Sequence, residues 1–435
     1  MSKKEKSDEG LTFKKSELSE WYPQVVVKSE LADYSPVKGF MIIRPRAYHI
    51  WQTIQDYFNI RLKKLNVRNA YFPLLIPEEF FKREAGHAKG FTPEVAWIAN
   101  REDSDEKDRL AIRPTSETVM YDSYSRWVRS WRDLPLRINQ WCNVVRWETK
   151  ATRLFLRTRE FLWQEGHCVY QTKDDCHKET LMYLGEYEKL CKELLALPVF
   201  KGQKPESEKF AGASNTYSID SFMPDGKSLQ CGTSHDLGQG FANSFNISFL
   251  DGSGNRSVPW QNSWGVSTRL IGALTMVHGD DKGLILPPRV AYNKLVIIPI
   301  FNDSNKKKVL SEAEKLFKEL KSFDPLLDDR DGYSPGWKFS EHELNGVPLR
   351  LELGPKDIEN KSVVVVKRNT GEKIHVKLKD LKKKIPELLD NIHDELYDNA
   401  LKLMNSLIVK TDDYDKLKKA ILDKKVVLTP ICGSS

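Results

Sequence analysis

The sequence predicts an α/β protein with two main folded parts, an α+β domain built on an antiparallel sheet and then a small α/β domain. Strand-like stretches dominate from Leu110 to about Met276 and are separated by turn signals, which favours an antiparallel sheet with helices on one side. After residue 289, apolar strands alternate with amphipathic helices, which is typical of a small domain with a mostly parallel sheet.

The first part begins with a polar segment. Residues 1–20 predict a tail with a lead-in helix. Apolar residues recur at helical spacing from Pro45 to Lys64, with proline near the start and basic residues at the end, so we expect a helix there. The apolar run Ala70–Pro77 predicts a strand, and Pro73 within it must lie at a sheet edge or a bulge because proline donates no ladder hydrogen bond.

The remaining elements follow in order. A helix is expected near Lys173–Leu195, and the turn-rich stretch His278–Arg289 connects the two domains. Beyond it we expect a buried strand at Lys294–Ile300, a helix to about Ser322, a strand at Val363–Val366 and a long helix from Leu378 to about Val409. The domain limits predicted from these changes are 1–20, 21–289, 290–385 and 386–435.

Composition restricts the class of protein. The chain of 435 residues is 40% hydrophobic and 30% charged, which is ordinary for a globular protein. No apolar run approaches the roughly 20 residues that span a bilayer, and no secretory signal is visible, which fits a cytoplasmic protein. Six cysteines with no C-x-x-C pair indicate reduced thiols. A net charge of +7 permits a polyanionic partner such as RNA without requiring one.

The stretch R-W-E-T-K at 146–150 carries the first chemical signal. Arg146 and Glu148 are two residues apart, so on a strand they point to one face. A guanidinium can grip a phosphate as a fork and a carboxylate can accept from an amino group, so the pair suits a nucleotide. Arg-x-Glu is also a common cross-strand ion pair, and the pattern alone leaves both interpretations open.

These stretches together resemble the class II aminoacyl-tRNA synthetases, and more narrowly the prolyl-tRNA synthetases of the archaeal and eukaryotic type, from about Glu20 to the last residue. The helix 45–64 and the strand ending at Pro73 are similar to motif 1, the dimer interface of the family. The matches to the other motifs are 146–165 with motif 2, W-G-V-S-T-R at 264–269 with motif 3, R-P-T-S-E-T at 113–118 with the proline-recognition loop, and Q-C-G-T-S-H at 230–235 with the strand that closes the pocket.

The resemblance implies ATP-dependent ligation of L-proline to tRNA(Pro) through prolyl-adenylate, by a cytoplasmic homodimer with the class II fold of an antiparallel sheet flanked by helices. Both steps move negative charge between phosphate and carboxylate oxygens, so preorganised cations are the main requirement. Arg146 would hold the α-phosphate and the substrate carboxylate, and Arg269 would hold other phosphates and the adenine face; these two are the catalytic candidates. The other residues implied to bind ATP are Glu148, Arg157, Thr158, Gln230 and Thr233.

The resemblance also implies a proline pocket. Thr115 and Glu117 would accept from the two N–H donors of the secondary ammonium, although the same residues fit a helix capping box. Phe161 and Trp163 would line the slot for the ring, although an aromatic stripe also occurs in a plain core. The remaining pocket residues implied are Arg146, Glu165, His235 and Ser267, and a lone histidine such as His235 can equally be structural.

Cofactors and further modules follow from the same resemblance. Magnesium is expected to accompany ATP with mostly phosphate and water ligands, and Asp220 is a candidate protein contact. No metal site is predicted: T-P-I-C-G-S-S at the end resembles the start of the family's C-terminal zinc module, but Cys432 would be a single ligand of an incomplete site in an apparently truncated module. The short span from Glu148 to Trp264 leaves no room for the editing domain of bacterial-type relatives.

The second domain resembles the anticodon-binding domain of related enzymes. Its candidate RNA contacts are Arg330, Lys338, Arg350, Lys356 and Arg368, each of which could also be an ordinary solvated charge. Three alternatives to the leading function remain: a sister synthetase for another amino acid, a non-RNA ligase on the same adenylation core, and a catalytically idle paralogue that binds RNA or a regulator. The presence of Arg146, Arg157 and Arg269 argues against the idle paralogue.

Overall fold

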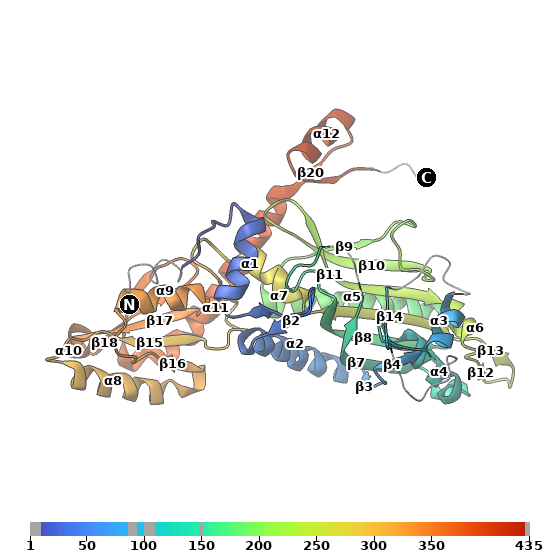
Figure 1. Ribbon diagram of the computed structural model, residues 1–435, viewed down its shortest axis with the longest axis horizontal. Coiled ribbons are helices and arrows are strands. Elements are labelled where there is room, and N and C mark those ends of the chain that lie inside the picture. The colour runs from blue at the N-terminus through green and yellow to red at the C-terminus, as the bar shows by residue number, and fades with distance from the viewer. Residues whose placement is uncertain (1–9, 86–93, 100–108, 148–150, 431–435) are drawn as a thin grey trace.

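The computed structural model describes residues 10–85, 94–99, 109–147 and 151–430. The molecule is elongated, with a large sheet at one end and a smaller sheet at the other (Figure 1). Within the described residues the large sheet has seven strands, antiparallel except where β3 pairs with β7. In sheet order they are β3 (Arg68–Asn69), β7 (Leu136–Val145), β8 (Glu160–Tyr170), β14 (Trp260–Ser267), β11 (Ser228–Gly238), β10 (Asn215–Phe222) and β9 (Phe200–Gln203).

Helices of the N-terminal part cover this sheet or its ends. They are α1 (Leu18–Lys28), α2 (Pro45–Lys64), α3 (Glu78–Ala85), α4 (Glu117–Trp127), α5 (Lys173–Leu195), α6 (Gly240–Ser244) and α7 (Arg269–His278), with a 3₁₀ turn η2 (Trp131–Asp133). Short strand pairs complete this part: β1 (Ala32–Tyr34) with β2 (Met41–Ile43), β12 (Phe249–Leu250) with β13 (Arg256–Ser257), and the set β4 (Leu75–Pro77), β6 (Leu110–Ile112) and β5 (Ala96–Trp97).

One face of the large sheet packs on α2 and α5. Trp264 of β14 stacks on Tyr183 of α5 with ring centroids 4.0 Å apart, and Phe58 of α2 stacks on Tyr187 of α5 at 5.2 Å. Gly166 lies under Trp264, where a Cβ atom would come within 2.1 Å of the indole, so no larger residue fits. The helix predictions for 45–64 and 173–195 are confirmed to the residue, because apolar periodicity and boundary signals are local.

The opposite face is only partly covered. Tyr121 of α4 and Phe241 of α6 pack together with ring centroids 5.5 Å apart, and a buried cluster that includes Val169 of β8 forms beneath them. The prediction of helices on one side of the sheet is therefore wrong, because α4 and α6 close one end of the second face. The uncovered remainder of that face forms a hollow.

The predicted strand at 70–77 is interrupted. Residues 70–74 lie outside the sheet ladders, and Pro73 belongs to neither β3 nor β4. The backbone N–H of Phe72 donates to Gln140, and the carbonyl oxygen of Phe72 accepts from Arg113 at 2.7 Å. Buried side chains from distant segments thus take the hydrogen bonds that a strand would have used.

The N-terminal segment has the lead-in helix that the sequence predicts, but the predicted limit at residue 20 cuts through it. Helix α1 begins at Leu18 and continues to Lys28. Leu18, Trp21 and Val25 are buried in the main core, so α1 belongs to the large domain.

The smaller sheet has five strands in the order β16 (Pro325–Leu327), β15 (Leu295–Pro299), β17 (Leu349–Leu353), β18 (Ser362–Lys367) and β19 (Lys373–Lys377). The pairs β16–β15 and β15–β17 are parallel, but β17–β18 and β18–β19 are antiparallel. The expectation of a mostly parallel sheet holds for β16, β15 and β17, whereas the β18–β19 hairpin adds two antiparallel pairings that the sequence analysis did not predict. Its helices are α8 (Lys306–Glu319), α9 (Pro335–Leu344) and α10 (Pro355–Glu359), with 3₁₀ turns η3 (Lys321–Phe323) and η4 (Leu378–Asp380).

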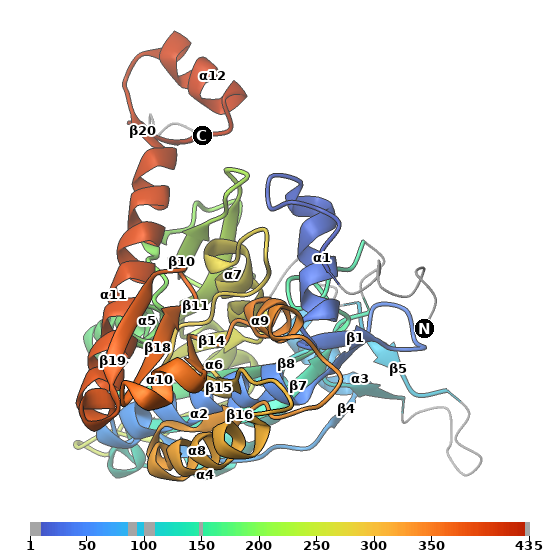
Figure 2. The same ribbon diagram turned by 90° about the vertical axis from the view of Figure 1, so that its left-hand side faces the viewer.

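A long helix, α11 (Leu381–Leu407), leads away from the small sheet to β20 (Ile408–Lys410), α12 (Tyr414–Leu422) and β21 (Val426–Leu428). Helix α12 projects above the rest of the molecule in Figures 1 and 2. The chain that follows it contacts the large sheet at the β10–β11 turn: Gly226 has φ +80°, and a Cβ atom there would lie 1.9 Å from the carbonyl oxygen of Lys424. No helix in the described part of the chain has the length and apolar character of a membrane span.

Candidate active site

Aromatic, acidic and imidazole side chains of β8 lie on the uncovered face of the large sheet, next to side chains of the neighbouring strands β7 and β14. Phe161, Trp163, Glu165 and His167 alternate along β8, as the sequence predicts. The register places Gln140 of β7 opposite Glu165, and it pairs Trp163 with Ser267 of β14. Three strands that are far apart in sequence therefore contribute to one surface.

A hollow of about 140 Å³ lies on this surface. Seven of the predicted site residues line it. The lining residues are Arg146, Phe161, Trp163, Gln230, Cys231, Gly232, Thr233, Gly265, Val266, Ser267 and Arg269. The walls combine two guanidinium groups with two aromatic rings. Such a combination can hold a flat apolar group and an anion side by side.

Arg146 is held against the aromatic wall. Its guanidinium carbon lies 5.4 Å from the ring centroids of both Phe161 and Trp163, within cation–π range. Its Nε donates to the carbonyl oxygen of Pro114 at 3.1 Å, so the arginine also contacts the 113–118 loop. Stacking and hydrogen bonding together fix the plane of the fork, which prepares it to meet two oxygens of one ligand.

Arg269 is the first residue of α7. Its Nε donates to the carbonyl oxygen of Leu156 and its Nη1 to that of Gln230, both at 3.2 Å. Its backbone N–H donates to the hydroxyl of Ser267, also at 3.2 Å. These contacts tie the motif 3 arginine to the β8 side and to the β11 side of the hollow.

The 113–118 loop lies beside Arg146. Arg113 is buried and donates to the carbonyl oxygen of Asn143 at 2.8 Å. The hydroxyl of Thr115 donates to the carboxylate of Glu117, and both residues are buried. Ser116 occupies the N-cap of α4 but its side chain makes no capping hydrogen bond, so the capping interpretation of this loop is wrong.

Glu165 anchors that loop from below. Its Oε1 accepts from the hydroxyl of Ser116 at 2.5 Å and from Nε2 of Gln140 at 2.9 Å. Its Oε2 accepts from the backbone N–H of Ser116 at 3.2 Å and lies 3.1 Å from Nε2 of His167. The sequence predicts Glu165 as a proline ligand, whereas in the structure both carboxylate oxygens bind protein donors and the side chain is only 2% exposed.

The Glu165–His167 pair is ionic. Burial opposes charge on both groups, but hydrogen bonds from His167, Ser116 and Gln140 hold the pKa of Glu165 below its usual value. Burial likewise opposes protonation of His167, yet the carboxylates of Glu165 and Glu117 raise its pKa. Nδ1 of His167 lies 3.0 Å from the hydroxyl of Tyr121, which extends the network into α4.

The carboxylates of Glu117 and Glu165 and the imidazole of His167 lie close enough together to be considered as ligands of a cation. Ligand atoms of Glu117, Glu165 and His167 are all within 4.8 Å of one another. Glu165 and His167 already use those atoms in hydrogen bonds, since Oε2 of Glu165 lies beside Nε2 of His167 and Oε1 of Glu165 accepts from Ser116. We therefore assign this cluster to loop positioning.

The other predicted site residues lie around the hollow or beyond it. Nδ1 of His235 lies 3.0 Å from the hydroxyl of Thr216, and burial, with the charge of His167, lowers its pKa to about 3, so the ring is neutral. Thr158 is buried and donates to the carbonyl oxygen of Glu160 at 2.7 Å. Arg157 is exposed, and its role stays a prediction. Glu148 and Cys432 lie outside the described residues.

The predicted RNA contacts differ in exposure. Lys338, Arg350 and Arg368 are buried and ion-paired, with Asp328, with Glu343 and Glu352, and with Asp280, respectively. Arg330 is exposed but forms a fork on Asp328 at 2.8 Å, and Lys356 is exposed. Arg350 and Arg368 could contact RNA only if they first broke their ion pairs with the acidic residues. In this conformation the two arginines therefore have a structural role.

Sequence reasoning missed several contributors. Gln140 and Ser116 complete the shell of Glu165, and Cys142 lies 3.4 Å from Oε1 of Glu165 and 3.3 Å from the indole nitrogen of Trp163. No local sequence pattern identifies Gln140 as a site residue, because its contact with Glu165 depends on the register between β7 and β8. The position of Ser116 between Thr115 and Glu117 was the one available signal.

Comparison with known proteins places both parts of the chain. Residues 97–278 match the family described as the tRNA synthetase class II core domain (G, H, P, S and T). Residues 294–388 match the anticodon binding domain family.

Similar proteins extend over nearly the whole chain. The proline–tRNA ligase of Alkaliphilus oremlandii is 49% identical over 97% of this chain and 88% of its own length. Proline–tRNA ligase 2 of Clostridioides difficile is 46% identical over 100% of this chain and 91% of its own length, and the proline–tRNA ligase of Rubrobacter xylanophilus is 48% identical over 98% and 90%.

Proposed function

Because this chain belongs to the proline–tRNA ligases, class II aminoacyl-tRNA synthetases, we propose that it joins L-proline to tRNA(Pro) in two steps. In the first step the carboxylate of proline attacks the α-phosphorus of ATP and pyrophosphate leaves. In the second step a terminal ribose hydroxyl of the tRNA attacks the prolyl carbonyl and AMP leaves. The observation that carries the proposal is the convergence of Arg146 and Arg269 on one hollow with Phe161 and Trp163.

Arg146 serves the reacting centre in this proposal. Its fork meets an oxygen of the α-phosphate and an oxygen of the proline carboxylate, which brings nucleophile and electrophile together and offsets the charge that develops between them. The cation–π contacts with Phe161 and Trp163 and the bond to Pro114 fix the fork before substrate arrives. The two rings then form the slot for the pyrrolidine ring.

Thr115 and Glu117 select the ammonium of proline in this proposal. A hydroxyl and a buried carboxylate side by side can accept from both N–H groups, and the carboxylate balances the positive charge once water is excluded. We assign Glu165 to positioning: it holds the loop that displays these two residues. His235, neutral beside Thr216, completes the far wall.

Arg269, Gln230 and Thr233 serve the nucleotide, since they line the hollow opposite the aromatic wall. Arg157 and Thr158 would extend this contact to the outer phosphates, and Glu148 would accept from the adenine amino group. Magnesium brought with ATP supplies charge neutralisation of the phosphates. Asp220 fits such an ion, because its Oδ1 is buried without a hydrogen-bond partner and it pairs in register with Gln230.

We further propose that the enzyme has no editing domain in cis. Between Tyr170 at the end of β8 and Trp260 at the start of β14, the chain forms α5 and strands of the same sheet, together with α6 and the β12–β13 hairpin. This compact connection supports the archaeal and eukaryotic type on architecture, although the relatives named above are bacterial.

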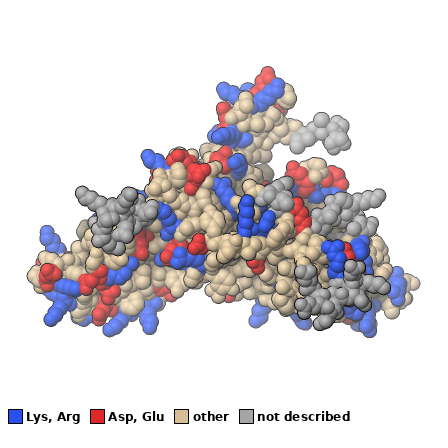
Figure 3. All heavy atoms as spheres, viewed as in Figure 1, with Lys and Arg blue, Asp and Glu red and all other residues tan. Residues whose placement is uncertain are grey.

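We propose a homodimer in the cytoplasm that takes its tRNA along both domains. Tyr48 and Ile60 of α2 and Tyr71 after β3 are 44%, 60% and 70% exposed, which is unusual for large apolar side chains and supports an interface over the motif 1 region. On the face shown in Figure 3, Lys and Arg are interspersed with Asp and Glu, so net charge alone does not mark the RNA path. The core of the large domain extends along the chain to Val290 and Ala291, and the strand that begins at Leu295 packs in the core of the small domain, which supports a domain limit near residue 289.

Proline-dependent exchange of labelled pyrophosphate into ATP tests the function without tRNA. Alanine, cysteine and threonine run beside proline in the same assay. We expect exchange with proline that is lost in Arg146→Ala and Thr115→Ala. Folded wild-type protein that exchanges with no amino acid would instead support the catalytically idle paralogue, and exchange with threonine alone would support a sister synthetase.

A further inference from the structure

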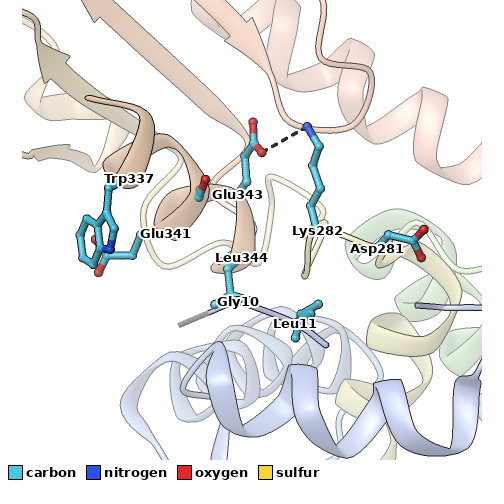
Figure 4. Close-up of a pocket in the computed structure, with 9 residues that line it drawn as sticks. Gly10, Leu11, Asp281, Lys282, Trp337, Glu341, Glu343 and Leu344 are labelled. Carbon is cyan, nitrogen blue, oxygen red and sulfur yellow. Dashed lines mark ion pairs between the residues drawn. The ribbon is translucent and has the colours of Figure 1, made fainter. Parts of the chain in front are cut away.

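The turn after α7, residues 278–284, is where the two domains meet. The backbone N–H of Leu284 donates to the carbonyl oxygen of Leu344 in the small domain at 3.0 Å. Gly283 has φ +139°, and a Cβ atom there would lie 2.5 Å from the Cα atom of Leu344, so the two backbones are in direct contact. A cavity of about 450 Å³ borders this joint, and Figure 4 shows Lys282 reaching across it to Glu343.

Arg368 grips this turn from the small domain. Its Nη1 and Nη2 donate to the two carboxylate oxygens of Asp280 at 2.8 and 2.6 Å, and its Nε donates to the carbonyl oxygen of Glu343 at 2.8 Å. The side chain of Arg368 is only 3% exposed. The side chain of Asp280 is 40% exposed, so the pair is buried on its arginine side only, but the bidentate fork is geometrically specific.

Asp280 is held on its other sides as well. Its Oδ1 accepts from the backbone N–H groups of Lys282 and Gly283, and its carbonyl oxygen accepts from the indole of Trp21 at 3.0 Å. Burial opposes charge on Asp280, but the hydrogen bonds and the charge of Arg368 hold its pKa below the usual value. The carboxylate is therefore ionised and fixed at the end of α7.

Helix α7 connects this joint to the active site. It starts at Arg269, ends at His278, and is buried at every position from Leu270 to His278. Lys15 binds the carbonyl oxygens of Val277 at 2.9 Å and Gly279 at 2.5 Å, which secures the C-terminal end. The ten residues of α7 span about 15 Å, and because nine of them are buried we expect the helix to shift as a rigid unit.

We propose that Arg368 is a positioning residue for Arg269: by fixing Asp280, it sets the axial position of α7 and so the reach of the nucleotide-binding arginine into the hollow. This inference rests on the proposed function, which assigns Arg269 to ATP. It replaces the sequence prediction of Arg368 as an RNA contact, because the guanidinium is buried and its Nε, Nη1 and Nη2 donate to protein acceptors. The small domain thereby acts on adenylation even without RNA.

Pyrophosphate exchange in the full chain, without tRNA, tests the proposal through the KM for ATP and the KM for proline. Arg368→Lys keeps the positive charge but loses the fork, and Asp280→Asn perturbs the same pair from the large domain. We expect each to raise the KM for ATP about fivefold, within the range for side chains that couple sites, and to leave the KM for proline within about twofold. The exchanged pair Arg368→Asp with Asp280→Arg should recover part of the loss.

Glu395→Gln is the matched control. Glu395 pairs with Lys367 and Asn369, the neighbours of Arg368 on the same hairpin, but it lies on α11 and makes no contact with Asp280 among the bonds of the described residues. It should lower the melting temperature without changing the KM for ATP. An unchanged KM for ATP in both Arg368→Lys and Asp280→Asn would overturn the proposal, as would an equal rise in Glu395→Gln. Wild-type exchange with proline, measured first, separates this failure from failure of the proposed function.

Discussion

Ser116→Ala should weaken proline activation through Glu165, although Ser116 touches no substrate in the proposed mechanism. The hydroxyl of Ser116 donates to Oε1 of Glu165 at 2.5 Å and accepts from Gln140 at 2.9 Å, and Ser116 is 1% exposed. Removing one buried hydrogen bond to a charged group costs about 2 kcal/mol where water cannot replace it. If the whole cost falls on the loop that displays Thr115 and Glu117, kcat/KM for proline falls about 30-fold.

The assay is pyrophosphate exchange at varied proline and at varied ATP. Ser123→Ala on the same helix α4 serves as the control, because its hydroxyl donates to the carbonyl oxygen of Val119 at 3.0 Å and accepts from Arg126 at 3.5 Å, both within α4. The KM for ATP should stay within about twofold in both variants, since the proposed nucleotide contacts Gln230, Thr233 and Arg269 lie on β11 and α7, outside the loop that Glu165 holds. An unchanged kcat/KM for proline in Ser116→Ala, or a rise of similar size in the KM for ATP, would refute the positioning role of Glu165.

Three further outcomes are expected. Arg146→Lys loses the fork and should lower exchange about 100-fold at saturating substrates, measured as kcat. Burial lowers the pKa of His278 to about 4, whereas the pKa in the unfolded chain is about 6.5, so the unfolded chain binds more protons between these two pH values. The free energy of unfolding should therefore fall by about 1.4 kcal/mol per pH unit as the pH drops from 6.5 to 4. His278→Gln should reduce this pH dependence, which denaturant titrations at several pH values measure. Gly226→Ala combines strain at φ +80° with a 1.9 Å clash against Lys424 and should expose the C-terminal segment to protease, whereas Gly254→Ala, at φ +83° with open space, should show only a loss of about 1 kcal/mol.

Local patterns were sufficient for the long helices. The apolar spacing of 45–64 and of 173–195 needs no distant partner, and both helices begin and end as predicted. The run 70–77 has an equally clear apolar pattern, yet Gln140 and Arg113 take the hydrogen bonds of Phe72 and break the strand. Tertiary contacts from distant segments decide such cases, and a single sequence does not display them.

In the candidate site, too, the sequence predicted the features that depend on local pattern and missed those that depend on distant contacts. Alternation along β8 predicted that Phe161 and Trp163 share one face, and the structure places both beside Arg146. The role of Glu165 depended on the β7–β8 register, which places Gln140 opposite it. Arg368 appeared as a surface charge in the sequence because its partner, Asp280, belongs to the connector between domains.

The order of strands in the large sheet has a consequence for how the enzyme is made. Strands β7 and β8 are neighbours in sequence and can pair as soon as they leave the ribosome, so the aromatic wall and the loop around Thr115 form early. Strand β14, which pairs with the other edge of β8, is synthesised only after α5 and β9–β13, and Arg269 follows it. Such distant pairing is slow, so a nascent chain that stops before β14 would expose the unpaired edge of β8, where chaperone binding during synthesis would be most needed.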